Sequence, residues 1–215
     1  MNSLLAELSG DFLPRFLVGM AVNFEIAVVA LAIGLALGML LALGRLRGGA
    51  AGVAAASAVT LMRAAPTFVV MFFLLNALPR EASLLGMPLA LSGMMTVALS
   101  LVPYSAAYVS DAGLDALRHW RDGSTLGALL FLPNVTRAFF VLVMSSSAGA
   151  AIGVTEGITV ILRQAEQLHS LDDRLLLFAL GIVMFGIPLQ LGFALIGLVQ
   201  RSLGRRAAVT DEASA

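Results

Sequence analysis

The chain has 215 residues, of which 60% are hydrophobic and 12% charged, and its mean hydropathy is +0.97. A water-soluble domain of this length could not hide so much apolar surface, because much of its area must face solvent. Its 13 basic and 13 acidic residues give a net charge of zero, which excludes the clustered positive charge of a nucleic-acid-binding protein. The composition predicts an integral membrane protein.

Five nearly charge-free runs are long enough to cross a membrane, which takes about 20 helical residues. In chain order they are residues 16–43, 50–78, 84–109, 124–155 and 175–200. None alternates apolar and polar residues as the strands of a membrane barrel do. The predicted fold class is therefore all-α: a bundle of five transmembrane helices formed by residues 16–206. The second and fourth runs hold more apolar chain than one straight crossing needs.

The ends of the chain flank this domain. Residues 1–15 lack the basic start of a cleaved signal peptide, so we expect them to form a periplasmic or interfacial segment. Placing the N-terminus outside puts seven arginines inside and four outside, which favours a cytoplasmic C-terminus. Residues 207–215 are small and polar, and we predict that they form a disordered cytoplasmic tail.

The residues that catalysis requires are missing at membrane depth. His119 and His169 both fall between the spans, and no aspartate lies inside one. The chain has no lysine and therefore no Walker-type phosphate loop, and it has neither an H-E-x-x-H nor a G-x-S-x-G motif. The absence of cysteine excludes thiolate metal ligands. We predict no catalytic residue, no metal site and no cofactor bound by this chain, which disfavours an enzyme.

Arg63 is the charged residue in the middle of the second run, and Pro66 follows it. An arginine at membrane depth is costly unless it is paired or faces water. It either lines or steers a solute path, or it is structural and snorkels or pairs with a helix end. Pro66 breaks the helical hydrogen bonding, and such breaks expose backbone groups to solutes in transporters. We interpret Glu25 as an interfacial carboxylate and Arg137 as an anchor.

Small residues mark two further features. The run Ser145–Ser147 places three hydroxyl groups in the fourth span. Such groups either line a polar cavity or hydrogen-bond to neighbouring helices, and packing is the commoner reason. The spacings Gly34/Gly38 and Gly149/Gly153 allow close approach of helices.

Four sequence blocks follow one another through the chain. They are Leu43-Gly44-Arg45-Leu46-Arg47, Arg63-Ala64-Ala65-Pro66 before a Phe-rich helix, Ser105-Ala106-Ala107-Tyr108, and Ala151-Ile152-Gly153-Val154-Thr155-Glu156 with Arg163-Gln164-Ala165 downstream. In order and spacing they resemble the G…G…A-L-x-R, R-G-T-P, A-Y and I-G-V-P-E…R-Q-A motifs of one family. That family is the membrane-spanning permease subunit of bacterial ATP-binding-cassette (ABC) importers for polar amino acids. The resemblance covers about residues 16–206.

The resemblance implies a type I importer permease fold and a multi-pass location in the bacterial inner membrane. The implied partners are a second permease subunit, two cytoplasmic ATPase subunits that bind ATP, and a periplasmic solute-binding protein. The implied substrate is an amino acid. The candidate residues of the solute path are Arg63, Pro66, Thr67, Tyr104, Ser145, Ser146, Ser147 and Glu156.

The loop before the fourth span departs from the family pattern. Family members carry an E-A-A-x-x-x-G motif whose short helix fits a groove on the ATPase, whereas only 23 residues separate Tyr108 from Leu132 here. Residues 111–123 can still form a helix of about 20 Å. The candidate coupling residues left in this shortened, degenerate loop are Asp115, Arg118, Arg121, Asp122 and Gly123.

Two functions follow from this departure. In the first, the chain is half of a permease heterodimer that transports polar amino acids, and its partner subunit is the more typical one. In the second, it is a non-transporting membrane scaffold or assembly subunit that has lost its coupling to the ATPase.

Overall fold

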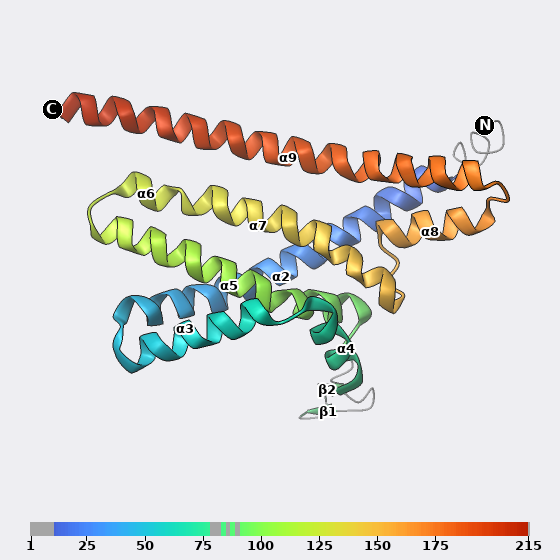
Figure 1. The fold of residues 1–215 in the computed structure, drawn as a ribbon, viewed down its shortest axis with the longest axis horizontal. Helices are drawn as coiled ribbons and strands as arrows, with labels where there is room; N and C mark the ends of the chain where they lie inside the picture. The colour runs from blue at the N-terminus through green and yellow to red at the C-terminus, as the bar shows by residue number, and fades with distance from the viewer. Residues whose placement is uncertain (1–10, 78–82, 85–86, 89–90, 215) are drawn as a thin grey trace. The chain divides into compact units, whose positions relative to one another are not determined.

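The computed structural model describes residues 11–77, 83–84, 87–88 and 91–214, and most of them are helical (Figure 1). The helices are α2 (Leu13–Arg47), α3 (Gly49–Ala64), α4 (Thr67–Ala77), α5 (Gly93–Arg121), α6 (Thr125–Leu129), α7 (Phe131–Ser145), the 3₁₀ helix η2 (Ser146–Ile152), α8 (Gly157–Gln167) and α9 (Leu171–Ser214). Two short antiparallel strands, β1 (Ser83–Leu84) and β2 (Met87–Pro88), pair with Ser83 opposite Pro88. The all-α prediction is confirmed.

Four of the described helical stretches are long and apolar enough to cross a membrane. They are Leu13–Arg47, Gly93–Arg121, Gly127–Ile152 and Leu171–Ser202. The bent pair formed by α3 and α4 counts as a fifth if it makes one broken span. The break falls at Ala65 and Pro66, where Ala65 is extended with φ −73° and ψ 112°, as the residue before a proline prefers. The five predicted crossings are therefore present when the second is counted as a broken helix.

The helices contribute to two compact units. Unit 1 contains Met1–Val29, Thr67–Leu101 and Val143–Leu189, and unit 2 contains Ala30–Pro66, Val102–Leu142 and Gln190–Ala215. The boundaries fall inside α2, α5, α7 and α9, so each of these helices contributes residues to both units.

The core of unit 1 joins the first turns of α2 to α8 and to the start of α9. Phe12, which directly precedes α2, and Phe16 and Met20 of α2 are buried against apolar residues of α8, including Ile161. Phe16 also meets Phe185 of α9 edge-on, with ring centroids 5.2 Å apart. Burial of these rings fixes α8 beside the beginning of α2.

In unit 2, α2 packs against α5 through two glycines. A Cβ atom at Gly34 would lie 2.0 Å from the Ser105 Oγ, and one at Gly38 would lie 2.7 Å from the Ala106 carbonyl oxygen. The predicted close packing at Gly34 and Gly38 is thus confirmed. At Gly153 it is wrong, because this glycine has φ +81° with no heavy atom near the place of a Cβ and ends the 3₁₀ helix.

The C-terminal helix differs from the sequence prediction. Residues 207–214, predicted to be disordered, continue α9 as far as Ser214. Extending a helix that is already formed avoids the cost of nucleation, and the alanines and arginines near this end favour helix.

Candidate functional site

Glu156, a predicted path residue, is fully buried at the start of α8, with 0% of its surface exposed. Its carboxylate accepts hydrogen bonds from the backbone N–H groups of Ile158 at 2.9 Å and Thr159 at 2.8 Å. The Thr159 hydroxyl donates a further bond at 3.0 Å. A carboxylate at this place satisfies N–H groups that a helix start leaves unpaired. In this conformation Glu156 holds α8 and offers no open face to a solute.

Asn23 on α2 completes the buried cluster around this cap. Its Nδ2 donates to Glu156 at 3.0 Å and to the Ser146 hydroxyl at 2.8 Å, while its Oδ1 accepts from the Gly157 backbone N–H at 3.1 Å. Ser146 in turn donates to the Val143 carbonyl oxygen at 2.7 Å. Asn23 is not among the site residues predicted from the sequence. Its signal was a neutral amide inside an otherwise apolar span, which needs polar partners when buried.

The three serines of the fourth span therefore lie in different surroundings. Ser146 is buried in the polar cluster, whereas Ser145 is half-buried next to it at the start of η2. Ser147 lines an apolar cavity of about 500 Å³ in unit 1, together with Ile158, Phe178 and Phe185. The packing interpretation fits Ser146, which hydrogen-bonds to Asn23 of α2. The cavity beside Ser147 is apolar, so it is not the polar cavity that the sequence analysis considered.

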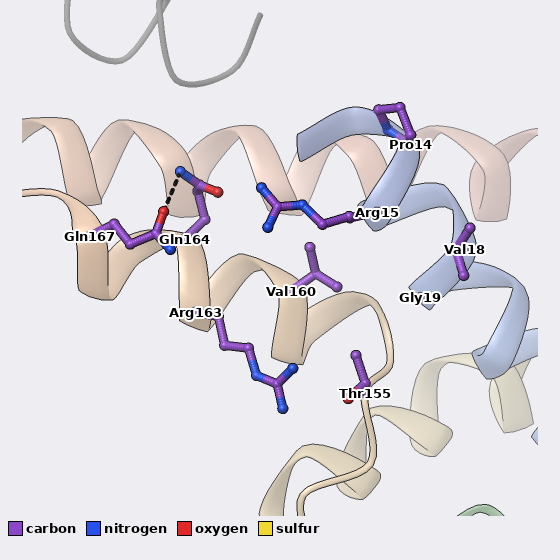
Figure 2. A pocket seen from close by; sticks show the side chains of 9 residues that line it. All are labelled: Pro14, Arg15, Val18, Gly19, Thr155, Val160, Arg163, Gln164 and Gln167. Atoms are coloured by element: carbon purple, nitrogen blue, oxygen red, sulfur yellow. Dashed lines mark hydrogen bonds between the residues drawn. The ribbon is translucent and has the colours of Figure 1, made fainter. Parts of the chain in front are cut away.

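A second cavity of unit 1, of about 320 Å³, lies between the start of α2 and α8 (Figure 2). Figure 2 shows the Arg15 side chain extending toward Gln164, while Arg163 lies on the other side of Val160. The Gln164 amide donates to the Gln167 side-chain oxygen at 3.3 Å. Two arginines and two glutamines therefore border one largely apolar cavity, and the Arg15 Nε already donates a hydrogen bond to the Asp11 carbonyl oxygen at 3.1 Å. Arg163 and Gln164 belong to the R-Q-A block of the sequence, whereas Arg15 was counted only for the orientation of the chain.

Arg63 is paired in unit 2. Asp111 of α5 forms salt bridges with both Arg63 and Arg45, the latter at 2.7 Å, and Arg45 also donates to the Ser110 hydroxyl at 3.2 Å. The Arg45 side chain is 22% exposed and the Arg63 side chain 63%. The structural interpretation of Arg63 is thus supported by its ion pair, while much of its side chain stays accessible. Asp111, which follows the third span in the sequence, was missed as its partner.

The remaining candidate residues of the solute path do not belong to these clusters. Pro66 is exposed at the break between α3 and α4, and Thr67 is the half-buried first residue of α4. Tyr104 is partly exposed on α5 and lies 6.3 Å from the ring of Tyr108, centroid to centroid.

The predicted coupling residues occupy the last turns of α5 and the turn that follows. Asp115, Arg118, Arg121 and Asp122 are exposed, and Gly123 has φ +84°. Ser124 then caps α6, a helix of five residues, by accepting a bond from the Gly127 N–H at 3.2 Å. The prediction of a helix in this region is confirmed as far as Arg121. Trp120, which is not among the predicted coupling residues, is 66% exposed beside them.

The described residues hold no group of three or more His, Asp or Glu side chains able to bind a metal ion. Arg137, interpreted as an anchor, lines a polar groove in unit 2 with Gln190 and Gln200. Glu25 is exposed on α2, as an interfacial carboxylate is expected to be.

Comparisons with known proteins establish the fold. No protein-family model matches the sequence, and no curated protein gives a significant match. A solved structure described as the crystal structure of an amino acid ABC transporter with histidines matches at a TM-score of 0.67 with 19% sequence identity. The match covers 89% of this chain and 95% of that one. The chain therefore has the fold that the sequence blocks predicted.

Proposed function

We propose that this chain is the membrane-spanning subunit of an ATP-driven importer and forms the translocation path for polar amino acids. The observation that carries the proposal is the fold match, because it extends over nearly the full length of both chains and the matched protein is an amino acid ABC transporter. The four sequence blocks support the same function. At 19% identity, overall sequence similarity contributes little to the match.

The cavity lined by Arg15 and Arg163 supports recognition of an amino acid. Arginine guanidinium groups bind carboxylates through charge-assisted and often bidentate hydrogen bonds. The amides of Gln164 and Gln167 add polar groups, while Val18 and Val160 provide apolar walls. An amino acid combines a carboxylate with a side chain of variable polarity, and this lining suits both parts.

The proposed partners follow from the end of α5. Two cytoplasmic ATPase subunits would bind and hydrolyse ATP, and would contact the exposed residues Arg118, Trp120 and Arg121 beside the short α6. We further propose a second, more typical permease subunit, because the coupling region of this chain is short. The N-terminus would be periplasmic, where a solute-binding protein delivers the amino acid, and the C-terminus cytoplasmic in the bacterial inner membrane.

Reconstitution tests this proposal. The chain is co-purified with an ATPase, a permease and a binding protein encoded beside it, and placed in liposomes. We expect ATP-dependent uptake of at least one polar amino acid, and no uptake with an ATPase variant unable to hydrolyse ATP. A panel of amino acids that stabilise the binding protein selects the solutes to test.

The shortened coupling region favours the scaffold as a second candidate function. The same preparation separates the two. A complex that assembles but shows neither uptake nor solute-stimulated ATP hydrolysis would support the scaffold, whereas uptake that depends on this chain would exclude it.

A further inference from the structure

Helix α5 carries a polar stripe made of Tyr104, Tyr108 and Asp111, which all belong to unit 2. Intervals of four and three residues place these side chains on one face of the helix. Among residues 102–111, only these three and Pro103 are not buried. Tyr104 is 38% exposed, and the Asp111 side chain is 40% exposed. The stripe is therefore the accessible face of this part of α5.

The stripe begins deep inside a candidate membrane span, which runs from Gly93 to Arg121. At 1.5 Å per residue, Tyr104 lies about 17 Å from the first residue of the helix and about 26 Å from the last. The hydrocarbon core of a bilayer is about 30 Å thick. A side chain that is exposed at such a depth faces lipid, another protein or water.

The composition of the stripe differs from that of a lipid-facing surface in the same unit. Among residues 30–43 of α2, the exposed side chains are all alanine or leucine; they are Ala32, Ala36, Leu37, Leu40 and Leu43. The stripe of α5 instead offers two phenol hydroxyls and a carboxylate. Because polar and charged groups are costly in hydrocarbon, we infer that the stripe faces water.

One net positive charge lies at the end of the stripe. Asp111 forms salt bridges with both Arg45 and Arg63, so two positive charges meet one negative charge. The Arg63 side chain is 63% exposed, which leaves part of its guanidinium open to a ligand. Tyr108 precedes Asp111 by three residues, or about 4.5 Å along the helix axis. An aromatic surface therefore lies about one helical turn from a cationic group.

We propose that the polar stripe and Arg63 bind the zwitterionic group of an amino acid. The Arg63 guanidinium pairs with the carboxylate of the solute, as arginine does in charge-assisted hydrogen bonds. The ring faces of Tyr104 and Tyr108 attract its ammonium group through cation–π interactions. The inference rests on the proposed transport function and adds the residues that contact the solute in unit 2. Because all amino acids share these two groups, we expect the stripe to accept solutes with different side chains.

Reaction with cysteine tests whether water reaches the stripe. The chain contains no cysteine, so an introduced thiol reacts without background. Tyr104→Cys is labelled with a water-soluble, charged methanethiosulfonate reagent in the detergent-solubilised complex with its permease and ATPase partners. Leu40→Cys is the matched control, since Leu40 is 66% exposed on the apolar face of α2. We expect Tyr104→Cys to react at least tenfold faster, because the reactive thiolate forms where water has access.

Protection by solutes tests binding. Ala112→Cys places the thiol beside Asp111 and keeps every residue of the stripe. L-Glutamine, L-arginine and L-glutamate, added one at a time, should each slow its labelling. Adding Arg63→Gln should raise the concentration for half-protection about fivefold, the effect of one lost hydrogen bond between charged groups, whereas Arg47→Gln should not change it.

The tyrosine variants separate a binding role from a structural one. Tyr108→Leu should raise the half-protecting concentration about threefold, and Tyr108→Phe should leave it unchanged because the ring face remains. This pair also tests the proposal if Arg63→Gln does not fold.

Four outcomes overturn the proposal. They are equal labelling of Tyr104→Cys and Leu40→Cys, labelling of Tyr104→Cys in the isolated chain but not in the complex, no protection by any of the three amino acids, and protection that neither Arg63→Gln nor Tyr108→Leu weakens. The second outcome would assign the stripe to a partner subunit. Uptake by the reconstituted complex without protection overturns the binding role of the stripe alone, whereas protection without ATP-dependent uptake contradicts the transport function and leaves the binding site standing.

Discussion

Asn23 and Glu156 are hydrogen-bonded at 3.0 Å although they lie 133 positions apart in the chain. The bond joins the apolar helix α2 to the start of α8, and both side chains are completely buried. Because buried polar groups are costly when left without partners, these two residues specify how α2 and α8 fit together. The Glu156 carboxylate that accepts this bond also caps α8 through the N–H groups of Ile158 and Thr159.

Replacing Asn23 with leucine should destabilise the protein by about 2–3 kcal/mol, the cost expected when a hydrogen bond to a charged group is lost and its partners stay buried. Asn23→Leu leaves the Gly157 N–H and the Ser146 hydroxyl without the amide that bonds to them. Thermal or chemical unfolding of the purified chain in one detergent measures the difference.

Glu25→Gln is the control for this variant, because Glu25 lies two residues further along α2 and is exposed. It should leave the free energy of unfolding within about 0.5 kcal/mol of wild type. Equal stability of Asn23→Leu and wild type would contradict the structural importance of the cluster.

A methyl group at Gly19 should also separate α2 from α8. The Cβ of Gly19→Ala would lie 2.8 Å from the carbonyl carbon of Glu156 and 2.9 Å from the backbone nitrogen of Gly157. Backbone atoms cannot rotate aside as a flexible side chain can, so we expect a loss of about 1–3 kcal/mol. Unfolding measurements under the same conditions as for Asn23→Leu provide the test.

Gly186→Ala is the matched substitution in unit 1, since no heavy atom lies within 4 Å of its added Cβ. There the higher helix propensity of alanine should stabilise the protein by up to about 1 kcal/mol. We therefore expect the free energy of unfolding to fall in Gly19→Ala and to rise in Gly186→Ala. A change in the same direction in both variants would mean that contact with α8 does not decide the stability of Gly19→Ala.

The parts of this molecule that the sequence predicts are those set by local physics. Charge-free runs indicate the spans because the bilayer excludes unpaired charge, and Pro66 indicates the break because it cannot donate a backbone hydrogen bond. Pairing between distant segments carries no such local signal. Nothing near Arg63 indicates that Asp111 accepts its charge, and nothing near Glu156 indicates that Asn23 closes the cap. The sequence therefore predicts that Glu156 lines a path. In the structure its carboxylate instead contacts the first N–H groups of α8 and the side-chain amide of Asn23.

The two arginines paired with Asp111 should contribute unequally to stability. Arg45 is the less exposed of the two and also bonds to Ser110, so Arg45→Gln should cost about 1.5–3 kcal/mol. Arg63 is mostly exposed, so Arg63→Gln should cost less than about 1 kcal/mol. Unfolding of both variants, with the exposed Arg47→Gln as a control, tests the order. A larger cost at Arg63 would contradict it.

Arg63→Ala should lower amino-acid uptake more than it lowers the amount of protein in the membrane. Its small expected cost in stability leaves abundance nearly unchanged, while the largely exposed Arg63 side chain can act on a passing solute. Uptake by cells, divided by the amount of permease on an immunoblot, measures this difference. Equal losses of uptake and abundance would assign Arg63 a structural role alone, shared with Asp111.

The end of α5 should carry the contact with the ATPase. Arg118 and Arg121 are exposed there. Because exposed ion pairs contribute about 0.5 kcal/mol each, the double variant Arg118→Gln/Arg121→Gln should bind the ATPase about fivefold more weakly. When the ATPase concentration is limiting, the weaker binding should also lower solute-stimulated ATP hydrolysis by the reconstituted complex. Arg47→Gln with Arg201→Gln is the matched control, since both arginines are exposed and predicted to face the cytoplasm. Unchanged ATP hydrolysis and unchanged assembly in the Arg118 and Arg121 variant would exclude a coupling role for this region. That result would favour the scaffold function.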